Sequence, residues 1–452
     1  MDRRNALLLL GLSLPAAQAP GQSIRTKAPD GKPARRTLII GAGLSGLAAA
    51  QALQAAGEDV VVIEARGRIG GRIWTSTLWP ETPLDLGASW IHGVRGNPLT
   101  KVADRIGAAR WVTEYDRSVI YDASGQPLDE TAGERLEKLD GQLWKRIRQA
   151  QDRDPDVSVR SLAESLAKNS EERRFVNFLL SGGIEQEYAG SADRLSAHWF
   201  DSAKEFRGDD ALFAEGFHVI TRHLAEGLRI ETEQVVQEVH WQETPVRVVT
   251  RKSTFTGDRI VITLPLGVLQ AGSVQFVPDL PATKRAAIAA LGMGVLNKCY
   301  LRFPRVFWPD DVDWLEYVSE KHGEWTEWVS LARAAGKPVL LGFNAATQGR
   351  ALEALPDRQI VADAMRTLRR IFGSGIPDPT GHQITRWASD PFARGSYSYT
   401  PIGATPRSRR ELARPVDGRL FFAGEATDAD YHATAHGAYL SGRRVAEEVI
   451  KS

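Results

Sequence analysis

Three glycines early in the chain have the spacing that lets a backbone wrap around a diphosphate: Gly41, Gly43 and Gly46. They follow an apolar run at residues 38–40 and lead into an Ala- and Leu-rich segment. This order predicts a strand, a tight turn and a helix whose N-terminus offers N–H groups to phosphate oxygens. A second predicted strand, residues 59–63, ends in Glu64, where an acid commonly holds a ribose hydroxyl. The chemistry expected here is therefore the binding of a dinucleotide by a βαβ unit.

A second pattern, EARGRIGGRIWT at residues 64–75, places arginines on both sides of a Gly-Gly pair. Arginines so placed can fold back on a dianionic diphosphate through directional, charge-assisted hydrogen bonds. The glycine turn, the acid and the Gly-Gly-Arg together resemble the FAD signature of the flavin amine oxidase family. The resemblance implies that Glu64 holds the adenosine ribose, and that Arg66, Gly71 and Arg72 lie near the diphosphate and the flavin.

The resemblance continues at several separated places along the chain, and it implies an α/β fold. A discontinuous, Rossmann-like FAD-binding domain is expected to combine with an α+β substrate domain. We expect the FAD-binding domain to take residues 36–111, 213–295 and 381–452, and the substrate-binding domain residues 112–212 and 296–380.

The stretch DLGASWIHGVRGNP, residues 85–98, combines small residues with two rings. It resembles the polyamine oxidase branch of the family, where the corresponding stretch lines the flavin and the amine tunnel. Its members with implied contacts are Gly87, Ala88, Ser89, Trp90 and His92. A histidine titrates near neutral pH, so His92 is implied to contact the substrate amine and to help it lose a proton. Without the resemblance, a structural histidine in a loop is the simpler interpretation.

Lys298 stands among apolar and aromatic residues in VLNKCYLRF, residues 295–303, which reads as a strand. Alternation places Leu296, Lys298 and Tyr300 on one face. A lysine there is costly to bury unless it has a partner. The family implies that Lys298 holds a water under flavin N5 and helps the reduced flavin react with oxygen. The alternative is a lysine on the solvated face of an edge strand.

The C-terminal part returns to the cofactor. In RWASDPFARGSYSY, residues 386–399, Ser396 stands where covalent monoamine oxidases carry a cysteine, so the resemblance implies non-covalent FAD. It also implies that Tyr397 forms one wall of the aromatic cage, and the second cage position falls at Thr434. The further implied cofactor contacts are Trp387 on the ring system, Gly424 and Glu425 at the ribityl-diphosphate region, and Val236 at the adenine.

Residues 112–214 have a higher charge density, and apolar residues recur there at spacings of three and four. We expect a helical insertion that covers the flavin and forms one wall of the substrate site. Glu185 and Glu187 lie in it, and an enzyme for a polycation needs anionic groups, but exposed acids are common and a surface position is the simpler interpretation. Short β-like runs at 314–318, 325–330 and 339–344, with a helix at 357–372, are expected to complete the substrate domain.

The chain has 452 residues, a size that suits two domains, and its net charge of +1 favours neither nucleic acid nor an anionic membrane as partner. Its single cysteine, Cys299, excludes disulfides within the chain and cysteine-based metal sites, and we expect no metal. Residues 1–19 read as a signal peptide with paired arginines, followed by a flexible leader at 20–35. We expect export by the twin-arginine machinery to the periplasm or outside.

These features lead to an FAD-dependent oxidase that converts an amine, expected to be a polyamine such as spermidine or spermine, to an imine. Molecular oxygen would accept the electrons and form hydrogen peroxide. Thr434 in place of a cage aromatic argues against a simple aromatic monoamine. The alternatives are an L-amino-acid oxidase on the same fold, which needs an arginine for the substrate carboxylate, and a non-catalytic flavin-binding or electron-transfer protein. The export signal argues against a chromatin demethylase, and the Lys298 and His92 segments argue against a desaturase.

Overall fold

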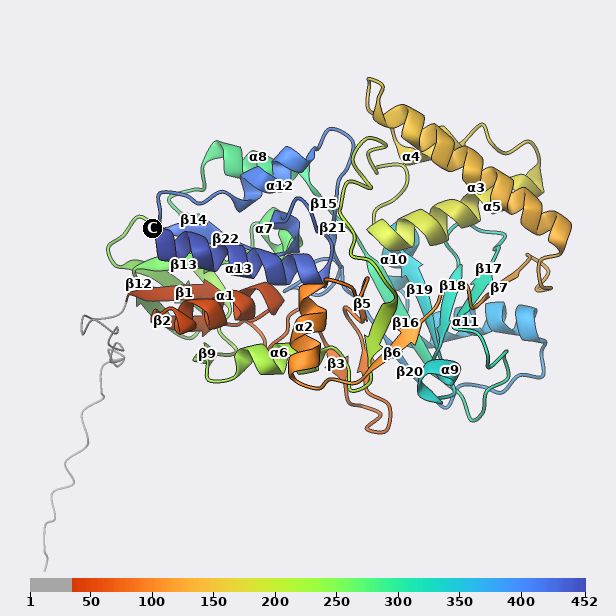
Figure 1. Cartoon of the computed structure of the whole chain (residues 1–452), viewed down its shortest axis with the longest axis horizontal. Helices are drawn as coiled ribbons and strands as arrows, with labels where there is room; N and C mark the ends of the chain where they lie inside the picture. The colour runs from red at the N-terminus through yellow and green to blue at the C-terminus, as the bar shows by residue number, and fades with distance from the viewer. Residues whose placement is uncertain (1–34) are drawn as a thin grey trace, which may run out of the picture.

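The computed structural model describes residues 35–452, so the predicted signal peptide and nearly all of the leader lie outside the described residues. Figure 1 shows two bodies side by side, one built around the first strands of the chain and one around the strands near residues 296–345. Within the described residues, no helix is both long enough and apolar enough to cross a membrane.

A five-stranded, all-parallel sheet forms the centre of the first body, in the order β22-β13-β1-β2-β9. Its strands come from distant parts of the chain: β1 (Arg36–Ile40), β2 (Asp59–Ile63), β9 (Ile230–Glu231), β13 (Arg259–Ile262) and β22 (Leu420–Phe422). The apolar runs are short and bounded by turns, as expected of parallel strands that are buried on both faces. The predicted α/β fold with a discontinuous Rossmann-like body is confirmed.

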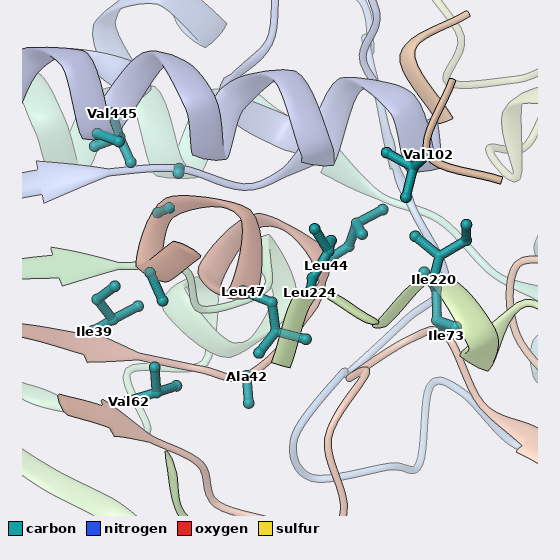
Figure 2. Close-up of a cluster of buried hydrophobic side chains, with 14 of the residues drawn as sticks. Ile39, Ala42, Leu44, Leu47, Val62, Ile73, Val102, Ile220, Leu224 and Val445 are labelled. Carbon is teal, nitrogen blue, oxygen red and sulfur yellow. The ribbon is translucent and has the colours of Figure 1, made fainter. Parts of the chain in front are cut away.

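Alternate side chains of this sheet enter two separate cores. Ile39 and Val62 point to the face covered by α1 (Leu44–Ala55), α2 (Pro98–Arg105), α6 (His218–Ala225) and α13 (Ala435–Lys451), as Figure 2 shows. Leu38 and Ile63 point to the opposite face. That face is covered by a four-stranded sheet and three helices: β10 (Val236–His240), β11 (Val246–Thr250), β12 (Thr254–Gly257), β14 (Gln275–Val277), α7 (Leu266–Gln270), α8 (Ala282–Ala290) and α12 (Pro406–Ala413).

A six-stranded sheet, in the order β20-β16-β19-β18-β17-β7, forms the second body. Its pairs are antiparallel except for β17 with β7. The strands are β7 (Ser118–Tyr121), β16 (Leu296–Arg302), β17 (Trp314–Tyr317), β18 (Glu327–Ser330), β19 (Val339–Ala345) and β20 (Gly381–Ile384). Three helices flank this sheet: α9 (Leu331–Ala335), α10 (Ala346–Glu353) and α11 (Asp357–Phe372), the last with the predicted bounds.

The insertion between the bodies is helical only in part. It begins with two strands, β6 (Arg110–Thr113) and β7, because these segments pair with β8 and β17, which come much later in the sequence. Its helices lie at the upper right of Figure 1: α3 (Glu130–Gln151), α4 (Val159–Ala163) and α5 (Ser170–Leu180), which continues as a π-helical turn (Ser181–Gln186). The small remaining strands are β3 (Thr75–Ser76), β4 (Leu84–Asp85), β5 (Trp90–Ile91), β8 (Asp210–Phe213), β15 (Gly292–Met293) and β21 (Ser398–Tyr399).

One expected domain limit needs correction. The last FAD-domain segment was expected to begin at residue 381, but β20 pairs with β16 in the six-stranded sheet. The pairing of Cys299 with Ile384 and of Arg302 with Gly381 keeps this strand in the second body. The chain therefore leaves that sheet after Ile384, and the other domain limits stay predictions.

Candidate active site

The glycine turn between β1 and α1 is open toward a cavity. Gly41 has φ +109, and a Cβ there would lie 2.5 Å from Thr263 Oγ1; a Cβ on Gly46 would lie 2.0 Å from the Gly41 carbonyl oxygen. Both positions therefore need glycine for close packing. A Cβ on Gly43, in contrast, would meet nothing within 4 Å, and α1 begins with no capping side chain and no acid in its first turn. Its free N–H groups fit a bound phosphate.

Glu64 braces this turn. Its carboxylate accepts hydrogen bonds of 2.8 Å from the backbone N–H of Ala42 and of 2.8 Å from that of Arg66, and the side chain is buried. Arg66 in turn donates to Asp390 at 2.7 Å. Arg68, which the sequence interpretation did not single out, donates to the Gly71 carbonyl at 2.9 Å and so closes the Gly-Gly loop. The loop is thereby held against the glycine turn.

A cavity of about 330 Å³ runs from the glycine turn to the second body, and it collects most of the predicted site residues. Those that line it are Gly41, Gly43, Glu64, Arg66, Gly71, Arg72, Gly87, Ala88, Val236, Lys298, Trp387, Tyr397, Gly424, Glu425 and Thr434. Four predicted residues are not part of its lining: Gly46, Ser89, Trp90 and His92. An open helix N-terminus in the cavity wall fits a dinucleotide cofactor with its diphosphate at the turn. The individual roles of these residues stay predictions.

Lys298 is buried in the centre of its sheet. Strand β16 has β19 on one side and β20 on the other, so the alternative of an edge-strand lysine is wrong. Lys298 Nζ donates to the carbonyl oxygens of Asp85 at 2.9 Å and Gly87 at 2.7 Å, and also to Ser89 Oγ. Burial lowers the pKa of Lys298 to about 7, against the opposing charge of Asp85. A buried amine with a pKa near neutrality can give or take a proton at physiological pH.

Asp85 is a buried acid behind Lys298 to which the sequence interpretation gave no role. Its carboxylate accepts from Thr75 Oγ1 at 2.5 Å and from the backbone N–H of Phe217 at 3.0 Å. Burial raises the pKa of Asp85 to about 6, although these hydrogen bonds and Lys298 oppose the shift. Ser89 and Trp90 also contact the Lys298 ammonium group. Ser89 Oγ accepts a hydrogen bond from Nζ, and the Trp90 ring lies 5.5 Å from Nζ.

The C-terminal residues at the cavity are fixed by contacts with other elements. Trp387 donates its indole N–H to the Leu86 carbonyl at 3.1 Å. Ser396 Oγ accepts from the Leu296 N–H at 2.8 Å and donates to the carbonyl of the same residue at 3.0 Å. Tyr397 donates to the Gln186 carbonyl, and burial raises its pKa well above the ordinary value. Thr434 caps α13 by accepting from the Gly437 N–H at 3.0 Å.

His92 lies outside the cavity lining, and its partner is Asp210. The two side chains share a hydrogen bond of 2.7 Å between Nδ1 and Oδ2, and the His92 ring stacks on Trp90 with 6.4 Å between centroids. Burial acts to lower the pKa of His92, but the charges of Asp210 and of Glu187 outweigh burial and raise it. The side chain is 48% exposed, so contact with a substrate amine stays a prediction that the geometry permits.

Three carboxylates, Glu187, Glu316 and Glu327, lie around Tyr397 of the cavity wall, and sequence reasoning missed the last two. Glu316 on β17 and Glu327 on β18 are direct cross-strand partners. Burial, together with the like charges of Glu316 and Glu187, raises the pKa of Glu327 to about 8. Like charges directly opposite each other are destabilising, so this pairing favours a bound cation. Within residues 35–452 no lysine or arginine forms an ion pair with Glu187, Glu316 or Glu327.

The two acids of the insertion behave differently from each other. Glu185, expected at the surface, is buried, and it pairs with His322 at 2.7 Å and with the Ala192 N–H at 2.8 Å. This correction follows from packing between the π-helical turn and the second body. Glu187 is exposed, as expected, but its charge acts on Tyr115 and Tyr397. The 58% exposed Tyr115 stacks on Trp314 at 4.6 Å, which adds an aromatic wall beside these acids.

Known proteins share this arrangement of sequence and fold. The sequence profile described as flavin containing amine oxidoreductase matches residues 44–450. Polyamine oxidase 2 of Arabidopsis thaliana is 33% identical over 449 residues, which cover 95% of this chain and 89% of the relative. The protein FLOWERING LOCUS D of the same plant is 36% identical over 453 residues, and lysine-specific histone demethylase 1 homolog 1 of Oryza sativa subsp. japonica is 36% identical over 455 residues. The chain spans 57% and 53% of the length of these two relatives.

Among solved structures, wild-type putrescine oxidase bound to putrescine has a TM-score of 0.76 at 22% identity, over 92% of this chain and 99% of that one. At this identity the likeness shows the fold. The family match, in contrast, begins just after the glycine turn, covers nearly every described residue and includes the Lys298 strand. The chain therefore belongs to the flavin-containing amine oxidoreductases, and its cofactor is FAD.

Proposed function

We propose that the enzyme oxidises a polyamine such as spermidine or spermine to an imine and passes the electrons to oxygen, which becomes hydrogen peroxide. The observation that carries this proposal is the group of carboxylates Glu187, Glu316 and Glu327, which lies around Tyr397 of the cavity wall without lining the cavity itself. A substrate with several positive charges places one amine at the cofactor and another among these acids. The names of the polyamine oxidase relatives support the same substrate class.

Bound FAD, which we propose is held without a covalent bond, supplies the acceptor for a hydride equivalent from the carbon next to the reacting nitrogen. The nitrogen loses one proton, so two electrons and two protons leave the amine and reduce one oxygen molecule. The protein residues hold and desolvate the amine. We assign to Tyr397 and Tyr115 the apolar walls of the site, to His92 contact with the amine, and to Lys298 the positioning of a water that exchanges protons during oxygen reduction.

An L-amino-acid oxidase is the nearest alternative, and the charge distribution disfavours it. Such an enzyme needs an arginine at the reacting end to pair with the substrate carboxylate. Four arginines line the cavity: Arg66 and Arg72 are already paired, with Asp390 and Glu425 respectively, and Arg251 and Arg394 are not among the groups whose charge acts on Tyr397. The charges that act on Tyr397 come from Glu187 and Glu327 and are negative.

The substrate proposal is tested with Glu316→Gln and Glu327→Gln. Glu320→Gln serves as the matched control, because Glu320 follows the same strand but is 57% exposed at the side chain. At pH 9, above the pKa of Glu327, we expect each site variant to raise the KM for spermidine about ten-fold or more, since each removes a charge–charge contact, while kcat changes little. The KM for a secondary amine with one charge should change much less. Equal effects on both substrates, or none on spermidine, would contradict the proposal.

We also propose that the protein is exported in folded form by the twin-arginine machinery and acts in the periplasm or outside the cell. The support is the arrangement of Arg3, Arg4 and the apolar run that follows them. Mass spectrometry of the protein from a periplasmic extract should find a chain that begins near residue 20. A full-length chain confined to the cytoplasm would refute this proposal.

A further inference from the structure

Arg409 on α12 is a fully buried arginine, with 0% exposure. It donates from Nη1 to Ser398 Oγ at 2.6 Å and to the Ala426 carbonyl at 3.4 Å, and from Nη2 to Thr400 Oγ1 at 3.3 Å. All of these acceptors are neutral. A buried guanidinium that is held only by neutral groups is costly, so its charge calls for a nearby anion.

The nearby anion is Glu425, one hydrogen bond further on. Ser398 Oγ, which accepts from Arg409, donates to Glu425 Oε2 at 2.6 Å. The other oxygen, Oε1, accepts from Arg72 Nη1 at 2.9 Å, and Arg72 lines the cofactor cavity. A hydrogen-bonded relay of alternating charge therefore runs from Arg409 on α12 through Ser398 and Glu425 to Arg72 at the cavity wall.

Arg72 enters the cavity beside the glycine turn. The preceding residue, Gly71, is so close to the turn that a Cβ on it would lie 3.3 Å from Gly43 Cα. The side chain of Arg72 is 23% exposed, and that of Glu425 only 5%. Glu425 thus has little access to bulk water to support its charge, and it depends on its protein partners.

The charges that act on the Glu425 carboxylate are mainly positive. Burial acts to raise the pKa of Glu425, but Arg72, the Ser398 hydroxyl and Arg409 together outweigh burial and lower it. The other charged or titratable groups that act on this relay are Asp428, which acts on Arg409, and His432, whose pKa burial lowers to about 3. Arg409 is therefore the distant cation that favours the ionised form of Glu425.

We propose that Arg409 is a positioning residue for the cofactor, which acts through Ser398 and Glu425 to hold Arg72 in place for FAD. Removal of Arg409 leaves Glu425 with one cation, so the carboxylate is protonated more easily and Arg72 loses its fixed orientation. The role concerns the cofactor alone and does not depend on which amine is oxidised.

The test begins with the holoenzyme and three variants: Arg409→Met, Arg409→Lys and Ser398→Ala. Release of FAD on dilution is followed by the rise of flavin fluorescence. We expect Arg409→Met and Ser398→Ala each to raise the Kd for FAD about ten-fold, and Arg409→Lys to restore part of the affinity. The double variant that combines Arg409→Met with Ser398→Ala should bind FAD no more weakly than Arg409→Met alone, because both changes break the same relay. Arg410→Met, an exposed neighbour on the same helix, is the matched control and should leave the Kd unchanged.

Two further readouts separate positioning from general destabilisation. The thermal midpoint is measured over a range of added FAD, since a weaker Kd reduces the FAD-dependent gain in stability. In Arg409→Met the Kd should also rise as pH falls from 7 to 5, because Glu425 then takes up a proton, whereas the wild-type Kd stays flat. A variant with a lower midpoint at every FAD concentration, an unchanged Kd and a flat pH profile would overturn the proposal. Additive effects of the two substitutions would overturn it as well.

Discussion

Replacing Gly43 with alanine isolates cofactor binding from protein stability. Gly43 has φ −74 and ψ 177, a conformation that alanine adopts without strain, and the added Cβ meets no protein atom within 4 Å. The substitution should therefore leave the FAD-free protein intact or raise its unfolding free energy by about 0.4–1 kcal/mol, because the unfolded chain loses conformational freedom.

The same methyl group projects into the space at the N-terminus of α1, where we place the diphosphate. A Cα–Cβ bond moves the nearest heavy atom outward by about 1.5 Å. N–H···O bonds of ordinary length then stretch beyond the range at which they are effective. The loss of one charge-assisted bond corresponds to about 1.5–3 kcal/mol, or roughly a ten- to hundred-fold rise in the Kd for FAD.

The assay combines FAD titration by flavin fluorescence with urea unfolding, both with and without FAD. Gly46→Ala is the control, because its Cβ would lie 2.0 Å from the Gly41 carbonyl oxygen. That variant should lose about 1–3 kcal/mol of stability under both conditions. If Gly43→Ala binds FAD as tightly as the wild type, the diphosphate does not lie at this turn and the reasoning fails.

Three other perturbations follow from the same structure. Lys298→Met should slow reoxidation of the reduced enzyme by oxygen about a hundred-fold and change its reduction by amine much less; stopped-flow traces that show the reverse would reject the role of Lys298. For Glu327, whose pKa lies near 8, the carboxyl is neutral below that pH, so inhibition by 1,8-bis(trimethylammonium)octane should strengthen from pH 7 to 9 in the wild type and stay flat in Glu327→Gln. Because the pKa of Glu327 is raised in the folded protein, the protonated carboxyl stabilises the fold at low pH, and this contribution is lost as pH rises through 8. Glu327→Gln, which carries no charge at any pH, should therefore raise the thermal midpoint at pH 9. Lys284 is buried and donates to the carbonyls of Glu411 at 2.8 Å and Leu412 at 2.9 Å, so Lys284→Met should lower stability by about 2–4 kcal/mol in urea without changing the Kd for FAD.

Local patterns predicted several elements of both bodies well. The glycine turn, the strand ending at Glu64 and the helix at residues 357–372 depend on neighbours in sequence, and the structure has all three. The strand around Lys298 was also predictable from alternation, and it spans Leu296–Arg302. These features are short-range, so composition and spacing carry enough information to find them.

The acidic end of the site was not predictable in the same way. Glu316 and Glu327 meet because β17 and β18 pair in one register, and a shift of one residue would separate them. Arg409 lies in PRSRREL, residues 406–412, which reads as a charged surface helix, yet its neighbour Arg410 takes the exposed position. Burial of one arginine among several depends on long-range packing against Ser398 and Thr400, which no local pattern records.

The most direct measurement of the central claim is anaerobic. The purified enzyme is mixed in turn with spermidine, spermine, an aromatic monoamine, a methyl-lysine peptide and a neutral L-amino acid, and the oxidised flavin band is followed. The account predicts fast bleaching by a polyamine, with recovery of the band and formation of hydrogen peroxide when air is admitted. Bleaching by the L-amino acid or the peptide alone would contradict the substrate proposal, and bleaching by none of the compounds would contradict the proposed amine oxidation itself.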